Sequence, residues 1–302
     1  MNSKLKTRAL YRTVRPIVQL AFFLFFYMIA FTFVYPFVRT VTIPITVPVL
    51  VSFRSYLSSV GGSLTFIQFM MSQPEFPWVP LASILIIGAL VGRLLCGWGC
   101  PFGFVQDLLS TIGKKKTNID HRTHEKMRNI KFAFLGITLM ISFSLAIMLY
   151  MGVGEEFKNA LGPFANGLFY AVSPNETFFG DIPNLFAAAS SGSLSFGTSS
   201  YLLYFNLFLL VCILIGAYKI PRFWCRYLCP LGAFMGILAK FSFVGIRRDL
   251  TRCDRSLECV KACPMQINIL NLPWEKFTHS ECTLCLECLD ACPNKALKLK
   301  IY

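Results

Sequence analysis

Charged residues and histidines are scarce in this chain. Asp, Glu, Lys and Arg make up 15% of its 302 residues, and it has three histidines. His121, His124 and His279 all lie outside the long apolar stretches, which excludes a haem held by two histidines inside a membrane. The sequence also lacks a glycine-rich phosphate loop, a flavin-attachment pattern and a nucleophile paired with a base, so no nucleotide or hydrolase site is predicted.

Apolar residues dominate instead. The chain is 55% hydrophobic and 15% aromatic, with a mean hydropathy of +0.58, which is typical of an integral membrane protein. Its net charge of +14 is compatible with nucleic-acid binding. However, the basic residues flank the apolar stretches as topology signals do, so we expect no nucleic-acid partner.

Four stretches approach the roughly 20 apolar residues that cross a bilayer. They are residues 17–38, 79–95, 132–153 and 201–218. Lys and Arg concentrate before the first stretch and between the second and third, whereas residues 154–200 carry one lysine and four acidic residues. The positive-inside rule therefore predicts a multi-pass protein with both termini in the cytoplasm. No small-residue cleavage site follows the first stretch, so we expect it to remain as a helix.

Eleven of the twelve cysteines have spacings typical of metal ligation, which predicts reduced thiols rather than disulfides. Cys282, Cys285, Cys288 and Cys292, followed by a proline, form the ferredoxin pattern C-x2-C-x2-C-x3-C-P. In that pattern three thiolates hold one 4Fe-4S cluster, and the fourth ligates a neighbouring cluster. The pattern therefore predicts a partner run, which is found upstream at Cys253, Cys259 and Cys263, with Ser256 replacing the second cysteine.

Crossed ligation assigns one cluster to Cys282, Cys285, Cys288 and Cys263. The second site would combine Cys253, Cys259 and Cys292, with Ser256 in place of the fourth cysteine. Serine is a hard ligand beside soft thiolates. Three outcomes remain open for that site: a 4Fe-4S cluster completed by Ser256 or another group, a 3Fe-4S cluster, or no cluster. A zinc ribbon is a less favoured alternative, because zinc spacings rarely take this form.

The motif C-x3-C-P occurs twice, at Cys96 and Cys100 and at Cys225 and Cys229, with an offset of 129 residues. Each copy ends an apolar stretch, which predicts two pseudo-repeated helix pairs. Four thiolates brought together by this symmetry would suffice for a further iron-sulfur cluster or a zinc ion at the membrane boundary. The alternative is that the cysteines merely pack as small apolar residues at a turn.

These patterns predict an all-α membrane domain of four transmembrane helices, residues 1–243, followed by a cytoplasmic α+β domain like a bacterial two-cluster ferredoxin, residues 244–302. Arg15 and Gln19, together with Arg93 and Arg226 beside the cysteine pairs, are candidates for contact with a quinone head group or a cluster. For the arginines, snorkelling to lipid head groups is the alternative. We expect His121 and His124, which lie in a basic loop, to be solvated. The less favoured alternative for them is a role in proton uptake at a quinone site.

The sequence resembles polytopic iron-sulfur membrane proteins of the NapH type, quinol dehydrogenase subunits that share their membrane core with NosR. The shared features are the Arg-Pro-Ile-Val-Gln opening from Arg15 to Gln19, the two C-x3-C-P pairs and the ferredoxin run. The departure is Ser256, which puts a full second cluster in doubt.

The resemblance implies an electron-transfer subunit in a bacterial or archaeal cytoplasmic membrane. It would pass electrons between quinone and a partner redox subunit, such as a ferredoxin-like protein, a cytochrome or a flavoprotein. Electron flow in either direction is compatible with this topology. The alternative function is an accessory electron donor or redox sensor for metalloenzyme maturation, without quinol oxidation.

Overall fold

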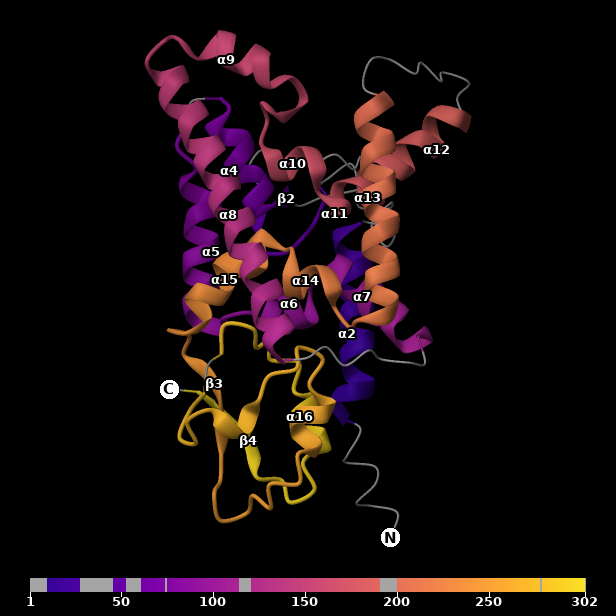
Figure 1. The fold of residues 1–302 in the computed structure, drawn as a ribbon, viewed down its shortest axis with the longest axis vertical. Helices are drawn as coiled ribbons and strands as arrows, with labels where there is room; N and C mark the ends of the chain where they lie inside the picture. The colour runs from indigo at the N-terminus through magenta and orange to yellow at the C-terminus, as the bar shows by residue number, and fades with distance from the viewer. Residues whose placement is uncertain are drawn as a thin grey trace.

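The computed structural model describes residues 10–27, 46–52, 61–73, 75–113, 121–190, 200–277 and 279–301. The structure is mostly helical, as predicted. A bundle of helices occupies one end, and the C-terminal segment, residues 244–301, occupies the other (Figure 1). The start of helix α2, at Leu10, lies at the same end as the C-terminal segment (Figure 1).

Helices α8 (His121–Tyr150) and α13 (Ser200–Lys219) are each long and apolar enough to cross a membrane. Their outer faces expose large apolar side chains such as Met140 and Phe208. Exposing such groups to water costs about 25 cal/mol per Å², whereas hydrocarbon imposes no such cost. These two helices confirm the third and fourth predicted stretches as apolar helices of spanning length, and their exposed apolar faces suit a lipid environment.

The first two predicted stretches differ from the expectation. Helix α2 (Leu10–Phe26) covers the start of the first stretch, and residues 28–38 lie outside the described part of the chain. The second stretch is not one continuous helix: α5 (Trp78–Val91) ends at Gly92, whose φ of 58° is left-handed. Glycine adopts this conformation without steric cost. The prediction of one helix over 79–95 is therefore wrong, and a separate short helix α6 (Leu94–Trp98) follows.

The two cysteine-proline corners share one local structure. Helix α6 is followed by α7 (Pro101–Ile112), and α14 (Phe223–Tyr227) is followed by α15 (Pro230–Ala239). In both corners the second cysteine is an extended N-cap residue and a proline begins the next helix. Proline suits this position because the first helical residue needs no hydrogen-bond donor and the residue before proline favours an extended conformation.

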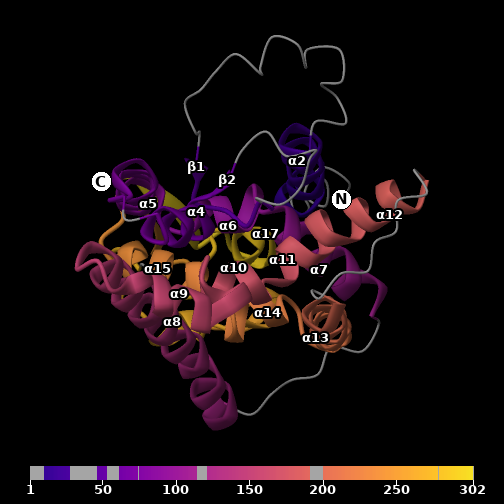
Figure 2. The same cartoon turned by 90° about the horizontal axis from the view of Figure 1, so that it is seen from above.

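Short elements fill the end of the bundle away from the C-terminal segment. Helices α10 (Leu168–Val172) and α11 (Pro174–Glu176) cross between α8 and α13 in the view from above (Figure 2). The remaining elements there are α4 (Ser63–Met71), α9 (Gly154–Leu161), η2 (Gly162–Phe164), η3 (Thr177–Asp181), α12 (Ile182–Ser190) and two parallel two-residue strands, β1 (Thr46–Val47) and β2 (Gly61–Gly62).

Aromatic packing lies at the centre of the bundle. The Trp224 ring stacks on Phe169 at a centroid distance of 6.5 Å and meets Phe102 edge-on at 6.4 Å. All three side chains are buried. Such contacts are worth about 0.5–1.5 kcal/mol each beyond the burial of apolar area. Since Phe102 and Trp224 are adjacent to the two corners, this packing fixes one corner relative to the other.

The C-terminal segment is built from two similar halves. Strands β3 (Val244–Arg248) and β4 (Leu297–Ile301) pair antiparallel, with Ile246 opposite Leu299. Helices α16 (Glu258–Ala262) and α17 (Glu287–Ala291) each begin after a left-handed leucine and end at a cysteine before a proline, and η4 (Ile269–Asn271) lies between them in sequence. The segment is therefore α+β, as expected.

The C-terminal segment packs directly on the first corner. A Cβ on Gly97 would lie 2.2 Å from the carbonyl oxygen of Thr283, so only glycine allows this approach. Next to it, Trp98 Nε1 donates to the Leu284 carbonyl oxygen at 2.9 Å. The backbone of α6 thus meets the loop that carries Cys282 and Cys285.

We predict that Gly97→Ala loosens this contact. Because the added methyl group would overlap backbone rather than a movable side chain, overpacking should cost about 1–3 kcal/mol of unfolding free energy. Limited proteolysis of the C-terminal segment and thermal unfolding in detergent would measure the change. Gly136→Ala is the matched control, because nothing lies within 4 Å of its Cβ position. Equal protease resistance of both variants would contradict the predicted backbone contact.

Candidate functional site

The two corners bring four buried thiols together. Each lies within electrostatic range of the other three, and each is at most 8% exposed. They come from segments more than a hundred residues apart, as the sequence repeat predicted. We call them the four-cysteine group: Cys96, Cys100, Cys225 and Cys229.

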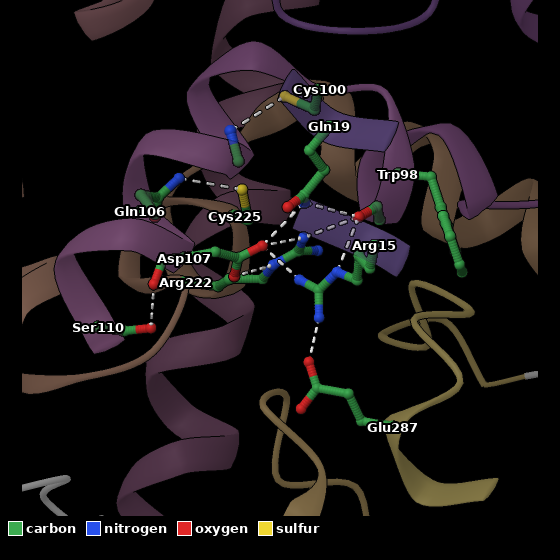
Figure 3. Close-up of polar contacts among 12 residues, drawn as sticks. Arg15, Gln19, Trp98, Cys100, Gln106, Asp107, Ser110, Arg222, Cys225 and Glu287 are labelled. Carbon is green, nitrogen blue, oxygen red and sulfur yellow. Dashed lines mark hydrogen bonds and ion pairs between the residues drawn. The ribbon is translucent and has the colours of Figure 1, made fainter. Parts of the chain in front are cut away.

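Three donors point at sulfur atoms of this group. The backbone N–H of Gly103 donates to Cys100 Sγ at 3.4 Å, and that of Gly232 donates to Cys229 Sγ at 3.2 Å. Gln106 Nε2 donates to Cys225 Sγ at 3.2 Å (Figure 3). Donors of this kind favour thiolate over thiol and tune the potential of a bound cluster. The sequence reasoning missed Gln106, which carries no motif of its own.

Two small cavities in the C-terminal segment are lined by the other motif cysteines. The first is bordered by Cys263, Cys282, Cys285 and Cys288, and the second by Cys253, Ser256, Cys259 and Cys292. These are the two sets that crossed ligation predicts. Sequence spacing alone was thus enough to predict which cysteines line each cavity.

The chemistry of each set fits an iron-sulfur cluster. Burial, together with the nearby thiols of Cys285 and Cys282, raises the pKa of Cys263 to about 12 in the metal-free chain. Such a thiol loses its proton when it ligates a metal. Within the described ranges, no three Cys, His, Asp or Glu side chains are placed to share a single metal ion. A cluster binds differently, because each of its thiolates ligates its own iron.

The loop around Ser256 has the same backbone conformation as the loop around Cys285. Arg255 and Leu257 have φ values of 55° and 62°, and the residues that flank Cys285, Leu284 and Leu286, have φ values of 48° and 61°. A left-handed residue other than glycine costs about 1–3 kcal/mol, so such residues persist only where the surrounding structure imposes them. Ser256 is therefore flanked by the same left-handed conformations as Cys285.

A cavity of about 390 Å³ lies between α2, α7 and the C-terminal segment. Arg15, Gln19 and Asp107 form part of its wall. Pro264 and Ala291, each next to a motif cysteine, form another part. The cavity thus borders both sets of C-terminal cysteines. Two of the four residues predicted to contact a quinone or a cluster, Arg15 and Gln19, line it.

A charge network stabilises this wall (Figure 3). Arg222 donates from Nε to Asp107 Oδ1 at 2.9 Å, and Gln19 Nε2 donates to Asp107 Oδ2 at 2.9 Å. Arg15 forms ion pairs with both Asp107 and Glu287. Burial alone would raise the pKa of Asp107, but the charges of Arg222 and Arg15 and these hydrogen bonds lower it to about 2. Asp107 is therefore a carboxylate at neutral pH.

The other two candidates, Arg93 and Arg226, lie elsewhere. They are 1% and 0% exposed, so the lipid-snorkelling alternative for them is wrong. Arg93 donates to the Ser280 carbonyl oxygen at 2.7 Å and to Glu281 Oε2 at 3.3 Å. Neither arginine is among the residues that line the 390 Å³ cavity. They belong to the contact between the helices and the C-terminal segment.

The expectation of a solvated His124 is also wrong. Its side chain is 6% exposed, and Nδ1 lies 3.0 Å from the Tyr227 hydroxyl and 3.2 Å from Arg226 Nε. Lys131 forms a buried ion pair with Glu281. The sequence reasoning treated the basic residues of this region as topology signals, which hid their structural partners.

Comparison with known proteins agrees with the cysteine geometry. The model of a 4Fe-4S binding domain matches residues 78–120 and 202–249, which contain the two C-x3-C-P motifs. A model of a 4Fe-4S dicluster domain matches residues 245–293. Both matches support iron-sulfur clusters as cofactors. No solved structure matches the chain.

The curated relatives are distant. An uncharacterized protein of Methanocaldococcus jannaschii is 26% identical over 67% of this chain and 61% of its own length. The putative electron transport protein YccM of Escherichia coli is 26% identical over 68% of this chain and 50% of its own. The ferredoxin-type protein NapH of Haemophilus influenzae is 23% identical over 63% of this chain and 53% of its own.

The matched part of the chain spans less than two thirds of each of these three relatives. Regulatory proteins named NosR also match. The predicted resemblance to NapH and NosR is therefore confirmed: the chain is a relative of ferredoxin-type electron-transport proteins.

We predict that Asp107→Asn destabilises the wall of the cavity. Removing one partner of a buried charge pair typically costs about 3–5 kcal/mol, because the remaining charges lose their compensation. Here Arg15 and Arg222 would share a neutral amide. Thermal unfolding in detergent would measure the loss. Ser110→Ala is the control, since among the described residues that hydroxyl donates to a carbonyl of its own helix, at 2.9 Å. Equal unfolding temperatures of the two variants would contradict the assigned role of Asp107.

Proposed function

From its relationship to ferredoxin-type electron-transport proteins, we propose that the chain is a membrane-bound electron-transfer subunit. It passes electrons between the quinone pool and a partner redox protein through iron-sulfur clusters. The observation that carries this proposal is the position of the 390 Å³ cavity, whose wall includes Pro264 and Ala291 beside two motif cysteines. A quinone bound there would lie next to both C-terminal cysteine sets.

The chemistry of the cavity suits a quinone head group. Its volume is within the roughly 300–1,000 Å³ of small-molecule sites. Phe104, Leu108 and Pro221 supply apolar wall, and Gln19 and Asp107 supply hydrogen-bonding groups. The two N–H groups of Gln19 already donate to the Gly97 carbonyl oxygen and to Asp107 Oδ2. Its side-chain carbonyl oxygen and the Asp107 carboxylate can each accept from a quinol hydroxyl. A quinol, which gives up two electrons, would there lie next to two cluster sites that each accept one electron.

We assign one cluster to each cysteine set, and each cluster takes up and releases one electron when bound. The first C-terminal site comprises Cys263, Cys282, Cys285 and Cys288. The second comprises Cys253, Cys259 and Cys292, and the fourth corner, at Ser256, determines whether it holds a 4Fe-4S or a 3Fe-4S cluster. The four-cysteine group forms a further site, which lies against the first through the contact of Gly97 with Thr283.

The proposed topology is multi-pass, with two helix pairs in residues 1–243, a domain of residues 244–302, and both termini in the cytoplasm. Contacts between the two ends of the chain support it. The backbone N–H of Arg12 donates to Asp290 Oδ2 at 3.0 Å, and Arg15 pairs with Glu287. The start of α2 therefore lies on the same side of the bundle as the C-terminal segment (Figure 1).

We predict that a quinol analogue reduces the clusters of the purified protein, followed by electron paramagnetic resonance. Gln19→Leu should slow this reduction at least tenfold, because the side-chain oxygen that accepts from the quinol hydroxyl is lost, while reduction by dithionite stays normal. Thr111→Ala is the matched control, since it borders the same cavity but its hydroxyl donates to the Leu108 carbonyl oxygen.

Reduction of wild-type clusters by a low-potential cytoplasmic donor but not by any quinol would contradict the quinone role. It would favour the accessory or redox-sensing function instead. If Gln19→Leu and wild type are reduced at equal rates, quinol oxidation would still be supported, but the assignment of the quinone site to this cavity would be wrong.

A further inference from the structure

Arg93 lies between the four-cysteine group and the first C-terminal cysteine set. It is the N-cap residue of α6 and directly follows Gly92, whose φ is 58°. One of its terminal nitrogens donates to the Cys225 carbonyl oxygen at 3.4 Å, and the other donates to the Ser280 carbonyl oxygen at 2.7 Å. A single guanidinium therefore contacts both cysteine-bearing regions.

The surroundings of Arg93 are shaped for this side chain. A Cβ on Gly232 would lie 2.9 Å from its terminal nitrogen, so the glycine leaves the space that the guanidinium fills. The Nε–H of Arg93 is buried and has no hydrogen-bond partner among the described residues. A buried donor without an acceptor costs about 1–3 kcal/mol, and such an atom often marks the place of a missing ligand.

The charge of Arg93 acts on both sets of thiols. It interacts with Cys96, Cys225 and Cys229 of the four-cysteine group and with Cys282 of the C-terminal set. At a fully buried site such interactions are screened far less than in water.

Charge counting separates Arg93 from Arg15 and Arg222. Arg222 also acts on Cys225 and Cys285, but Asp107 and Glu287 together balance Arg222 and Arg15. Glu281, in contrast, is shared by two cations, Arg93 and Lys131. Among Arg93, Lys131 and Glu281, one positive charge is therefore in excess, and it lies next to the thiols.

We propose that Arg93 is a positioning residue that couples the four-cysteine group to the first C-terminal cluster, with its Nε–H directed at a sulfur acceptor of the four-cysteine site. This inference rests on the presence of clusters in the proposed function, but not on quinone as the donor. Each electron added to a cluster adds negative charge, and the guanidinium stabilises that charge at both sites. It thereby keeps both potentials high enough for exchange between them.

The test is a mediated redox titration of three variants, monitored by electron paramagnetic resonance. Arg93→Gln should shift both midpoint potentials downward, each by at least a tenfold change in the reduction equilibrium, or 59 mV for one electron. Arg93→Lys keeps the charge but loses the Nε donor and the fork geometry, so its shifts should be smaller. Lys158→Gln is the control, since its amine donates to Ser72 at the far end of the bundle, and it should shift neither potential.

Glu281→Gln should shift the midpoint potentials in the opposite direction, which distinguishes an electrostatic effect from a loss of folding. Removing this anion from the same group should raise both potentials, whereas a general loosening of the contact would not reverse the direction. A double substitution of Cys96 and Cys225 by alanine assigns the signal of the four-cysteine site. A shift at only one site in Arg93→Gln, or at neither, overturns the proposal.

The mediators make this titration independent of quinone binding. If quinol fails to reduce the wild-type protein while both potentials still move in Arg93→Gln, the quinone role alone is wrong. If quinol reduces the protein and the potentials do not move, the inference about Arg93 alone is wrong.

Discussion

The packing of the helices against the C-terminal segment depends on one constraint: each buried cation needs partners that compensate its charge. Arg15, Arg93, Arg222 and Arg226 are all at most 4% exposed. A buried charge costs several kcal/mol unless partners surround it. In the C-terminal segment these partners include Glu281, Glu287 and Gln266. Arg222 finds its partners within the helices, but Arg15, Arg93 and Arg226 also use partners in the C-terminal segment. Helix packing and docking of the C-terminal segment are therefore coupled.

The contacts that compensate the buried cations also hold the candidate sites in place. Gly97 shows this most clearly, because its carbonyl oxygen accepts hydrogen bonds from Arg15, Gln19 and Arg222 at 3.2, 2.9 and 3.1 Å. This residue follows Cys96 and packs on Thr283, between two cysteines of the C-terminal set. One glycine thus joins the cavity wall, the four-cysteine group and the C-terminal loop. Docking, the proposed quinone site and the proposed cluster chain share one set of contacts.

Local spacing determined what could be predicted from the sequence. The sets that line the two C-terminal cavities and the convergence of the C-x3-C-P corners follow from residues close in sequence or from a repeat. Gly92 was missed because a single glycine within an apolar run does not by itself indicate a helix end. The partners of the buried arginines were missed because they lie 40 to 272 residues away, and no periodicity relates such positions. His124 was missed for the same reason.

The central claim is that the four-cysteine group holds a cluster within magnetic reach of the C-terminal clusters. Electron paramagnetic resonance of the fully reduced protein, with an iron count, tests it most directly when wild type is compared with a variant carrying Cys96→Ala and Cys225→Ala. The account predicts that the variant stays folded, contains less iron and lacks the part of the wild-type spin coupling that involves the four-cysteine site. The same iron content and the same coupled spectrum in both proteins would contradict it.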